Sequence, residues 1–182
     1  MRILSGEWQN RRIVPPKGIR PMTEMVKQAL FHVIGDCDSL RVLDLFAGSG
    51  QLGIETLSRG AAFSAFVERN PANADHLKRT LKTLGVSAER ARVLAADAVR
   101  YPASTRSFYD LVFMDPPYEK NFAVPALQAV VDNPSILAPA GRLVLRHTKH
   151  EPIDAVLTPS LERLFHRCYG DDVLNIWQKV SD

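Results

Sequence analysis

Cysteine, long apolar runs and metal-ligand clusters are what this 182-residue sequence has least of. Its two cysteines, Cys37 and Cys168, belong to no Cys-x-x-Cys pair and no Cys/His cluster, so we interpret them as reduced, buried thiols. The five histidines show no metal-ligand spacing. No apolar run reaches the roughly 18 residues of a membrane-spanning helix, and the start, MRILSGEWQNRR, lacks the apolar stretch of a signal peptide. These absences predict a cytoplasmic globular protein with no membrane segment and no bound metal.

A strong net charge is also missing, but the small excess of +3 is unevenly distributed. Residues 1–35 contain six Lys or Arg against two Glu, a net charge of +4, whereas the rest of the chain has 17 basic and 18 acidic residues, a net charge of −1. A basic segment on a near-neutral body favours a polyanionic partner. A solvated surface segment remains the alternative, and composition alone does not decide between them.

The alternation of strand-like and helix-like segments predicts the fold class. The strand-like segments are 41–46, 63–68, 91–97, 108–115 and 141–147. Helical spacing occurs over 23–35, 51–60, 70–85 and 124–133. Such alternation indicates an α/β protein with a doubly wound, mostly parallel sheet, and residues 161–180 predict an antiparallel hairpin at one edge. The length predicts one domain over 1–182, made of a basic N-terminal arm and helix over 1–35 and a Rossmann-like core over 36–182.

A glycine-rich loop follows the first predicted strand. Gly48, Gly50 and Gly53 have the G-x-G-x-x-G spacing, and Glu68 ends the second strand 18 residues after Gly50. Glycines let the backbone approach a ligand closely, and an acid at that strand end can hold two ribose hydroxyls. Taken alone, the pattern fits a nicotinamide dinucleotide site almost equally well, or a tight turn without a ligand.

Two further acids shift the interpretation. Asp44 lies beside the glycines, where a carboxylate would repel a pyrophosphate but would suit the ammonium group of an amino acid. Asp97 ends the third predicted strand, where it could accept a hydrogen bond from an adenine amino group. A loop hydrogen bond for Asp44 and a helix cap or turn acid for Asp97 are the plain alternatives. An ammonium, a ribose and an adenine without phosphate together describe S-adenosylmethionine.

The sequence MDPPYE, residues 114–119, ends the fourth predicted strand in a way that a core strand cannot continue. Asp115 and the carbonyl of Pro116, in a turn stiffened by Pro117, could accept both hydrogens of one planar amino group. Tyr118 could stack on a base. Holding an exocyclic amine in this way orients its nitrogen toward a methyl donor. With a reference pKa of about 3.9, Asp115 is expected to act first as a hydrogen-bond acceptor. A merely rigid loop is the alternative.

At this point the residues resemble a known family. VLDLFAGSGQLGIETLSRGA and FMDPPYE resemble class I S-adenosylmethionine-dependent methyltransferases of the N-methylating type. RILSG, RPMTEMVKQALF and CYGDDVLNIW narrow the resemblance to the RsmD family, bacterial enzymes that methylate N2 of a guanine in 16S ribosomal RNA of the small subunit. The resemblance covers nearly the whole chain. It implies a seven-stranded sheet with an antiparallel C-terminal strand.

The resemblance also implies roles for individual residues. Cofactor binding is expected of Asp44, Phe46, Gly48, Gly50, Glu68, Arg69, Asp97, Ala98 and Thr23. The target base is expected at the catalytic segment Asp115, Pro116, Pro117 and Tyr118. The charge of the basic segment, rather than the resemblance, predicts RNA contacts by the adjacent Arg11 and Arg12; Arg20 is expected to join them, and the resemblance places it near the cofactor or an active-site lid. The implied partner is ribosomal RNA or an assembling small subunit. Separately from the resemblance, we expect the protein to be a monomer.

Three other functions remain open from the sequence. An adenine-N6 methyltransferase would use the same D-P-P-Y segment, although the chain has no obvious DNA target-recognition domain. An NAD-dependent oxidoreductase would share the glycine loop but has no need of D-P-P-Y. A module that only binds its ligand would not explain why four acids stand at these positions.

Overall fold

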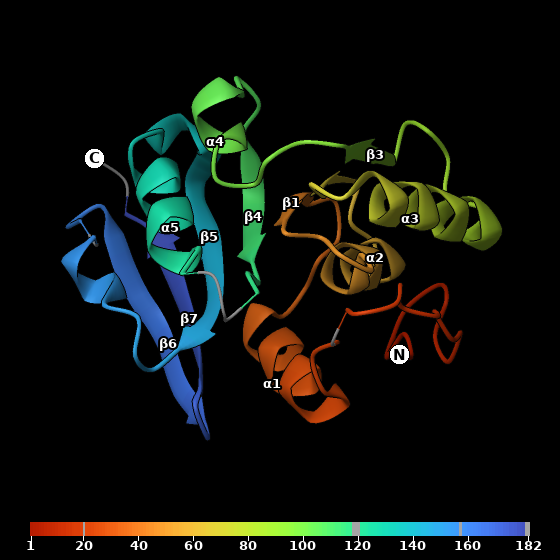
Figure 1. The fold of residues 1–182 in the computed structure, drawn as a ribbon, viewed down its shortest axis with the longest axis horizontal. Helices are drawn as coiled ribbons and strands as arrows, with labels where there is room; N and C mark the ends of the chain where they lie inside the picture. Colours follow the sequence, from red (N-terminus) through yellow and green to blue (C-terminus); the bar gives the residue numbers. More distant parts are fainter. Residues whose placement is uncertain (20, 118–120, 157, 181–182) are drawn as a thin grey trace. The chain divides into compact units, whose positions relative to one another are not determined.

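The computed structural model describes residues 1–19, 21–117, 121–156 and 158–180 (Figure 1). The chain divides into two compact units, Met1–Ala95 and Ala96–Asp182, which we describe in turn. The predicted boundary between an arm at 1–35 and a core at 36–182 stays a prediction. Within the described ranges, no helix has both the length and the apolar character needed to cross a membrane.

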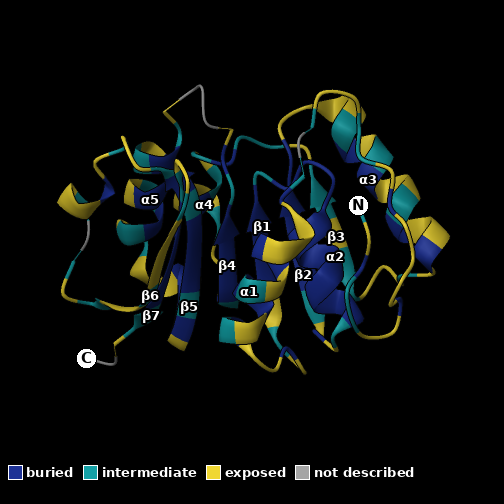
Figure 2. Cartoon of the chain, turned by 90° about the horizontal axis from the view of Figure 1, so that it is seen from below, coloured by how far each residue is buried: buried dark blue, intermediate teal, exposed yellow. Residues whose placement is uncertain are grey.

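The first unit is a three-stranded parallel sheet with its helices. Its elements are α1 (Glu24–Ile34), β1 (Arg41–Leu45), α2 (Gln51–Ser58), β2 (Phe63–Val67), α3 (Pro71–Leu84) and β3 (Ala91–Leu94). The strands follow the order β3-β2-β1, with Leu43 opposite Ala65 and Ala65 opposite Arg92. Every residue of α2 is buried, whereas α3 buries only one stripe of residues, three to four apart (Figure 2). This difference follows from sequence, because α3 carries charged residues on its outer face.

Helix boundaries follow the expected local signals. Thr23 caps α1 by accepting from the Val26 N–H, and Asn70 caps α3 through the N–H groups of Ala72 and Asn73. Pro71 occupies the first turn of α3, and its end is Gly85 in the left-handed conformation, with φ of 79°. These caps fix where each helix starts and therefore where the loop before it runs.

The N-terminal arm is packed against α2 within the first unit rather than extended into solvent. Its ends are joined by one β-bridge between Arg2 and Arg12, and Ile3, Trp8 and Ile13 are buried. At Gly6, with φ of 86°, an added Cβ would lie 1.7 Å from the carbonyl oxygen of Ser58 in α2. Only glycine permits this close approach. The arm therefore has a fixed inner side and an exposed basic outer side.

A buried carboxylate anchors the arm to α2. Glu55 is fully buried and accepts hydrogen bonds from the backbone N–H groups of Leu4 and Ser5, at 2.9 and 3.0 Å. Lys27 of α1, almost as buried, and Arg59 pair with it at 2.9 and 3.0 Å. A buried charge needs such partners, because their loss would leave it desolvated and uncompensated. One side chain thus ties three segments of the first unit together.

The second unit continues the strand–helix alternation and ends in a hairpin. Its elements are α4 (Tyr101–Ser104), β4 (Tyr109–Met114), α5 (Ala123–Val131), η2 (Pro134–Ile136), β5 (Leu137–Thr148), η3 (Ile153–Ala155), β6 (Leu161–Tyr169) and β7 (Asp172–Lys179). β4 and β5 pair in parallel, and β7 lies antiparallel between β5 and β6. The hairpin turns at Gly170, with φ of 68°. Helix α5 lies beside β5 (Figure 1).

The described residues contain seven strands, mostly parallel with antiparallel C-terminal pairings, so the predicted fold class is confirmed. Three details differ from the sequence predictions. The third strand ends at Leu94 rather than at residue 97. The fifth begins at Leu137, because a bulge over Pro139 to Gly141 lets the chain join β4 early. Both cysteines are free as expected, but Cys168 is exposed because the edge strand β6 has most of its residues in solvent.

Candidate active site

The glycine loop connects β1 to α2 in the first unit. Phe46, Gly48 and Gly50 all have positive φ, at 63°, 53° and 75°. Such a conformation is strained for an aromatic residue like Phe46, and strain of this kind gathers at functional sites. At Gly53, an added Cβ would lie 2.3 Å from the Phe66 ring, so this glycine lets α2 pack on β2. The third glycine of the motif therefore serves packing, while the first two shape the turn.

Two acids stabilise this loop through backbone donors. Asp44 is buried, and its Oδ2 accepts the N–H of Gly53 at 3.0 Å. Glu68 Oε2 accepts the N–H of Gly48 at 2.9 Å, and its Oε1 accepts the N–H of Asn70 at 2.7 Å. Glu68 thereby joins the loop after β1 to the loop after β2. For Asp44 this is the hydrogen bond to the backbone that the sequence left open as an alternative, whereas the hydrogen bonds of Glu68 to two loops were not foreseen.

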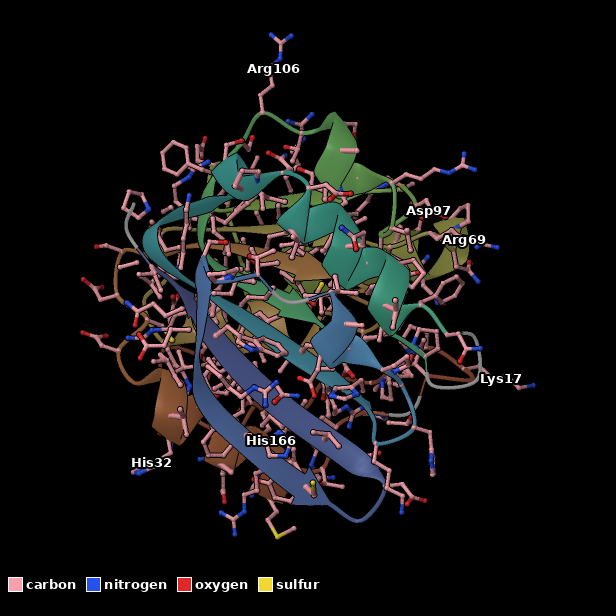
Figure 3. All side chains as sticks on the ribbon, turned by 90° about the vertical axis from the view of Figure 1, so that its left-hand side faces the viewer. Lys17, His32, Arg69, Asp97, Arg106 and His166 are labelled. Atoms are coloured by element: carbon pink, nitrogen blue, oxygen red, sulfur yellow. The ribbon has the colours of Figure 1, made fainter. Side chains whose placement is uncertain are left out.

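Asp97 and Ala98 belong to the second unit. Asp97 Oδ1 accepts the N–H groups of Val99 and Arg100, at 2.9 and 3.2 Å, just before α4. Asp97 therefore acts as a turn acid, one of the interpretations that the sequence left open, whereas Arg100 occupies the N-cap position of α4. A contact of Asp97 with adenine stays a prediction. Ala98 is buried, whereas Arg69, in the first unit, is exposed (Figure 3).

Asp115 directly follows β4, where the sequence placed it. Its Oδ1 accepts the Nε–H of Arg146 at 2.7 Å, and the two side chains are only 14% and 12% exposed. Arg146 Nη1 also lies 3.8 Å from Asp172 Oδ2. Burial raises the pKa of Asp115; the nearby Arg146 opposes that shift and Asp172 adds to it. The pKa of Asp115 thus lies above the reference value assumed from sequence.

The remaining predicted residues take varied positions. Pro116 is buried and Pro117 exposed, and Thr23 is exposed and serves as the cap of α1. Arg11 and Arg12 are exposed on the outer side of the arm. Arg20 and Tyr118 lie outside the described residues. No group of three His, Cys, Asp or Glu that could hold a metal ion occurs in the part of the chain that the structure describes.

Sequence reasoning missed the partners of Asp115. Arg146 interrupts the apolar run of RLVLRH, and Asp172 ends the Tyr-Gly-Asp-Asp turn. A buried strand that carries an arginine needs an acid nearby, so Arg146 within this apolar run could have predicted an acidic partner. Which acid it would meet depends on strand order, and no local pattern gives that order.

Comparisons with known proteins agree with this architecture. The family described as conserved hypothetical protein 95 matches residues 1–178. The chain is 35% identical over 159 residues to the ribosomal RNA small subunit methyltransferase D of Haemophilus influenzae, covering 84% of this chain and 81% of that one. It is 37% identical over 155 residues to the putative rRNA methyltransferase YlbH of Bacillus subtilis, covering 82% and 83%.

Solved structures support the same assignment. The putative methyltransferase yhhF of Escherichia coli superposes with a TM-score of 0.88, at 28% identity, over 100% of this chain and 99% of that one. The putative methylase HI0767 of Haemophilus influenzae gives 0.82, at 30% identity, over 99% and 98%. The resemblance stated from sequence is confirmed: the chain belongs to the conserved hypothetical protein 95 family, the RsmD family of Rossmann-like methyltransferases.

Proposed function

We propose that this protein transfers a methyl group from S-adenosylmethionine to the exocyclic N2 amine of a guanine in 16S ribosomal RNA. The observation that carries the proposal is Asp115, a mostly buried carboxylate at the end of β4 followed at once by two prolines. Family membership and the names of the relatives support a ribosomal RNA methyltransferase. The choice of guanine N2 rests on the resemblance to the RsmD family.

The first unit has the groups needed for the amino acid and ribose parts of the cofactor. Gln51, the first residue of α2, carries a buried Oε1 with no hydrogen-bond partner among the described residues. An unpaired buried acceptor is costly, and an ammonium donor from the ligand would satisfy it. Asp44 suits the same ammonium group, and Glu68 suits the ribose hydroxyls. In the second unit, Asp97 and Ala98 suit the adenine.

The chemistry follows from what Asp115 can accept. S-adenosylmethionine supplies a sulfonium methyl that is already electrophilic. The guanine amine is a poor nucleophile, because its lone pair is delocalised into the ring. When Asp115 and the Pro116 carbonyl hold its two hydrogens, the nitrogen is oriented for attack, and the carboxylate stabilises the positive charge that develops there. Asp115 would take the proton from the nitrogen as the nitrogen becomes cationic and would pass it to water, and S-adenosylhomocysteine would be the leaving group.

The basic outer side of the arm is the proposed RNA contact. Arg11 and Arg12 are adjacent and exposed, and Arg20 completes the predicted set. A guanine must leave its stack to reach Asp115, so unpaired RNA is the expected substrate. We expect a cytoplasmic monomer that acts on ribosomal RNA within an assembling small subunit.

Product analysis tests the proposal. The protein is incubated with methyl-labelled S-adenosylmethionine and separate pools of small ribosomal subunits, naked ribosomal RNA and DNA, and each pool is digested to nucleosides. Labelled N2-methylguanosine from ribosomal RNA is the expected product. Labelled N6-methyladenosine would replace the proposal with its adenine alternative. Thermal stabilisation by NAD rather than by S-adenosylhomocysteine would favour the oxidoreductase.

A further inference from the structure

The pairing of β4 with β5 places an arginine directly beside Asp115. Met114, the last residue of β4, lies opposite Leu145 of β5, so Asp115 and Arg146 are the next residues along each strand. Arg146 donates its Nε–H to Asp115 Oδ1 at 2.7 Å, and both side chains are mostly buried. The planar guanidinium holds a fixed direction for this bond, which an ammonium on a flexible stem would not.

A second acid reaches the same arginine from the neighbouring strand. Asp172, the first residue of β7, lies opposite Thr148 of β5, and its Oδ2 is 3.8 Å from Arg146 Nη1. The guanidinium therefore lies near two carboxylates from two different strands, and its shorter contact is with Asp115. The side chain of Asp172 is 33% exposed, so water shares in its solvation, whereas Asp115 depends more on Arg146.

We propose that Arg146 is a positioning residue, which occupies Oδ1 of Asp115 so that Oδ2 is presented to the target amine as the acceptor. This inference rests on the proposed function, because it deepens the role given there to Asp115. Without the arginine, the carboxylate could turn about its last bond and present either oxygen at a range of angles. Such freedom of the carboxylate would lower the reaction rate, because the reacting atoms must be held in line.

The same contact keeps Asp115 in the form that accepts hydrogen bonds. Burial is the main influence that raises the pKa of Asp115, Arg146 lowers it, and Asp172 raises it further. A protonated Asp115 would donate a hydrogen toward the amine instead of accepting one. Arg146 and Asp172 therefore act on the acid limb of the pH–rate profile in opposite directions.

The test compares Arg146→Met with Asp172→Asn in the full chain. The readouts are titration of the Asp115 carboxyl carbon by NMR without ligands, and single-turnover methylation across pH. Arg146→Met should move the titration midpoint and the acid limb up by about one pH unit or more, with a lower plateau rate. Asp172→Asn should move both down. Arg146→Lys should restore the midpoint more than the rate, because it returns the charge without the planar fork.

Controls separate this inference from the function on which it rests. Arg142→Met, in the same strand and on the same face as Arg146, should change neither readout. If Asp115→Asn abolishes methylation but neither Arg146→Met nor Asp172→Asn shifts the midpoint, the positioning role is wrong and the proposed function stands. If the wild-type protein forms no N2-methylguanosine, the proposed function fails; if Asp115→Asn methylates at the wild-type rate, the role given to Asp115 fails. Should Arg146→Met fail to fold, Arg146→Lys decides the matter: a midpoint near that of the wild type with a lower rate supports the positioning role, and a wild-type rate overturns it.

Discussion

The acids at the glycine loop and the acid that follows β4 are held in different ways. In the first unit, Asp44 and Glu68 accept hydrogen bonds from backbone N–H groups of the loops they join. In the second, Asp115 accepts from the side chain of Arg146. Backbone donors are neutral, and the fold itself places them. A guanidinium brings a full charge that burial and neighbours can modulate. The first arrangement suits fixed binding geometry, and the second suits a group whose protonation matters.

Glu55 sharpens this comparison, because it combines both kinds of donor. We expect Glu55→Ala to lower the free energy of unfolding by about 3–5 kcal/mol, since Lys27 would remain buried without its partner. Urea denaturation of the full chain measures the loss. Glu24→Ala, which breaks the exposed pair with Arg2, is the matched control and should cost under about 1 kcal/mol. Equal losses in the two variants would contradict the anchoring role of Glu55.

Asp115, the acid that a side chain holds, should matter for the rate of methylation. We expect Asp115→Asn to lower the methylation rate by about 10²–10³-fold, the usual effect of removing one transition-state partner. The amide can still accept from Arg146, but it would turn an N–H toward the amine. S-adenosylmethionine affinity, measured by calorimetry, should stay within a few-fold of wild type. Asp110→Asn, within β4, is the control, and a larger loss of affinity than of rate would assign Asp115 to the cofactor instead.

Glu68, an acid that backbone N–H groups hold, should matter for binding of the cofactor. We expect Glu68→Ala to weaken S-adenosylmethionine binding by about 1.5–3 kcal/mol and also to destabilise the fold, because the N–H groups of Gly48 and Asn70 lose their acceptor. Glu68→Gln keeps an acceptor oxygen and should separate the two effects, with stability partly restored. Calorimetry and urea denaturation give the two quantities. Unchanged affinity in both variants would remove Glu68 from the cofactor site.

Substitutions in the basic arm test whether positive charge in the first unit contributes to RNA binding. We expect replacement of Arg11 and Arg12 together by Ala to weaken RNA binding and to flatten its salt dependence by up to about two units of slope, one per lost phosphate contact. Filter binding at several salt concentrations measures this. The paired control is Arg79→Ala with Arg106→Ala, two exposed arginines elsewhere; Figure 3 shows Arg106 extending outward. Identical salt curves for both pairs would make the arm an ordinary solvated surface.

A smaller effect, on the pH dependence of stability, concerns the imidazole of His147 in the second unit. Burial lowers the pKa of His147 below 6.5, although its hydrogen bond to the Thr148 carbonyl opposes the shift. Below about pH 6.5 the unfolded chain therefore binds a proton at His147 more readily than the native protein does. The free energy of unfolding falls as the pH drops below that value. We expect His147→Gln to reduce the dependence of Tm on pH there by about 3 °C per unit at most.

The exposed His32 of α1 provides the control for this change. His32→Gln should leave the dependence of Tm on pH as it is in the wild type. His147 also accepts from Asn175 Nδ2 at 2.9 Å, and Asn175 Oδ1 in turn lies 2.8 Å from His166 Nδ1. A steeper pH dependence in His147→Gln than in the wild type would contradict the assignment of His147 as neutral.

Prediction from sequence succeeded where local signals decide the structure. The helices expected over 23–35 and 70–85 and the strand-end positions of Glu68 and Asp115 all follow from patterns along the chain. It failed where distant residues decide: Arg146 meets Asp115 only through strand pairing. Asp97 was expected at a strand end, but the ladder stops at Leu94 and Asp97 instead caps a turn. Ile3, Trp8 and Ile13 have no helical or strand spacing, so the burial of the arm had no periodic signal.

The attachment of the arm has a consequence for hydrogen exchange and folding order. The amides of Leu4 and Ser5 have no helix or extended ladder to protect them; their acceptor is a carboxylate about fifty residues away. Their exchange rates therefore report docking of the arm on α2, separately from the opening of secondary structure. Because so distant a contact costs loop-closure entropy, it should form after α2 has packed on its sheet. Slow exchange at these two positions would mark the last step of folding in the first unit.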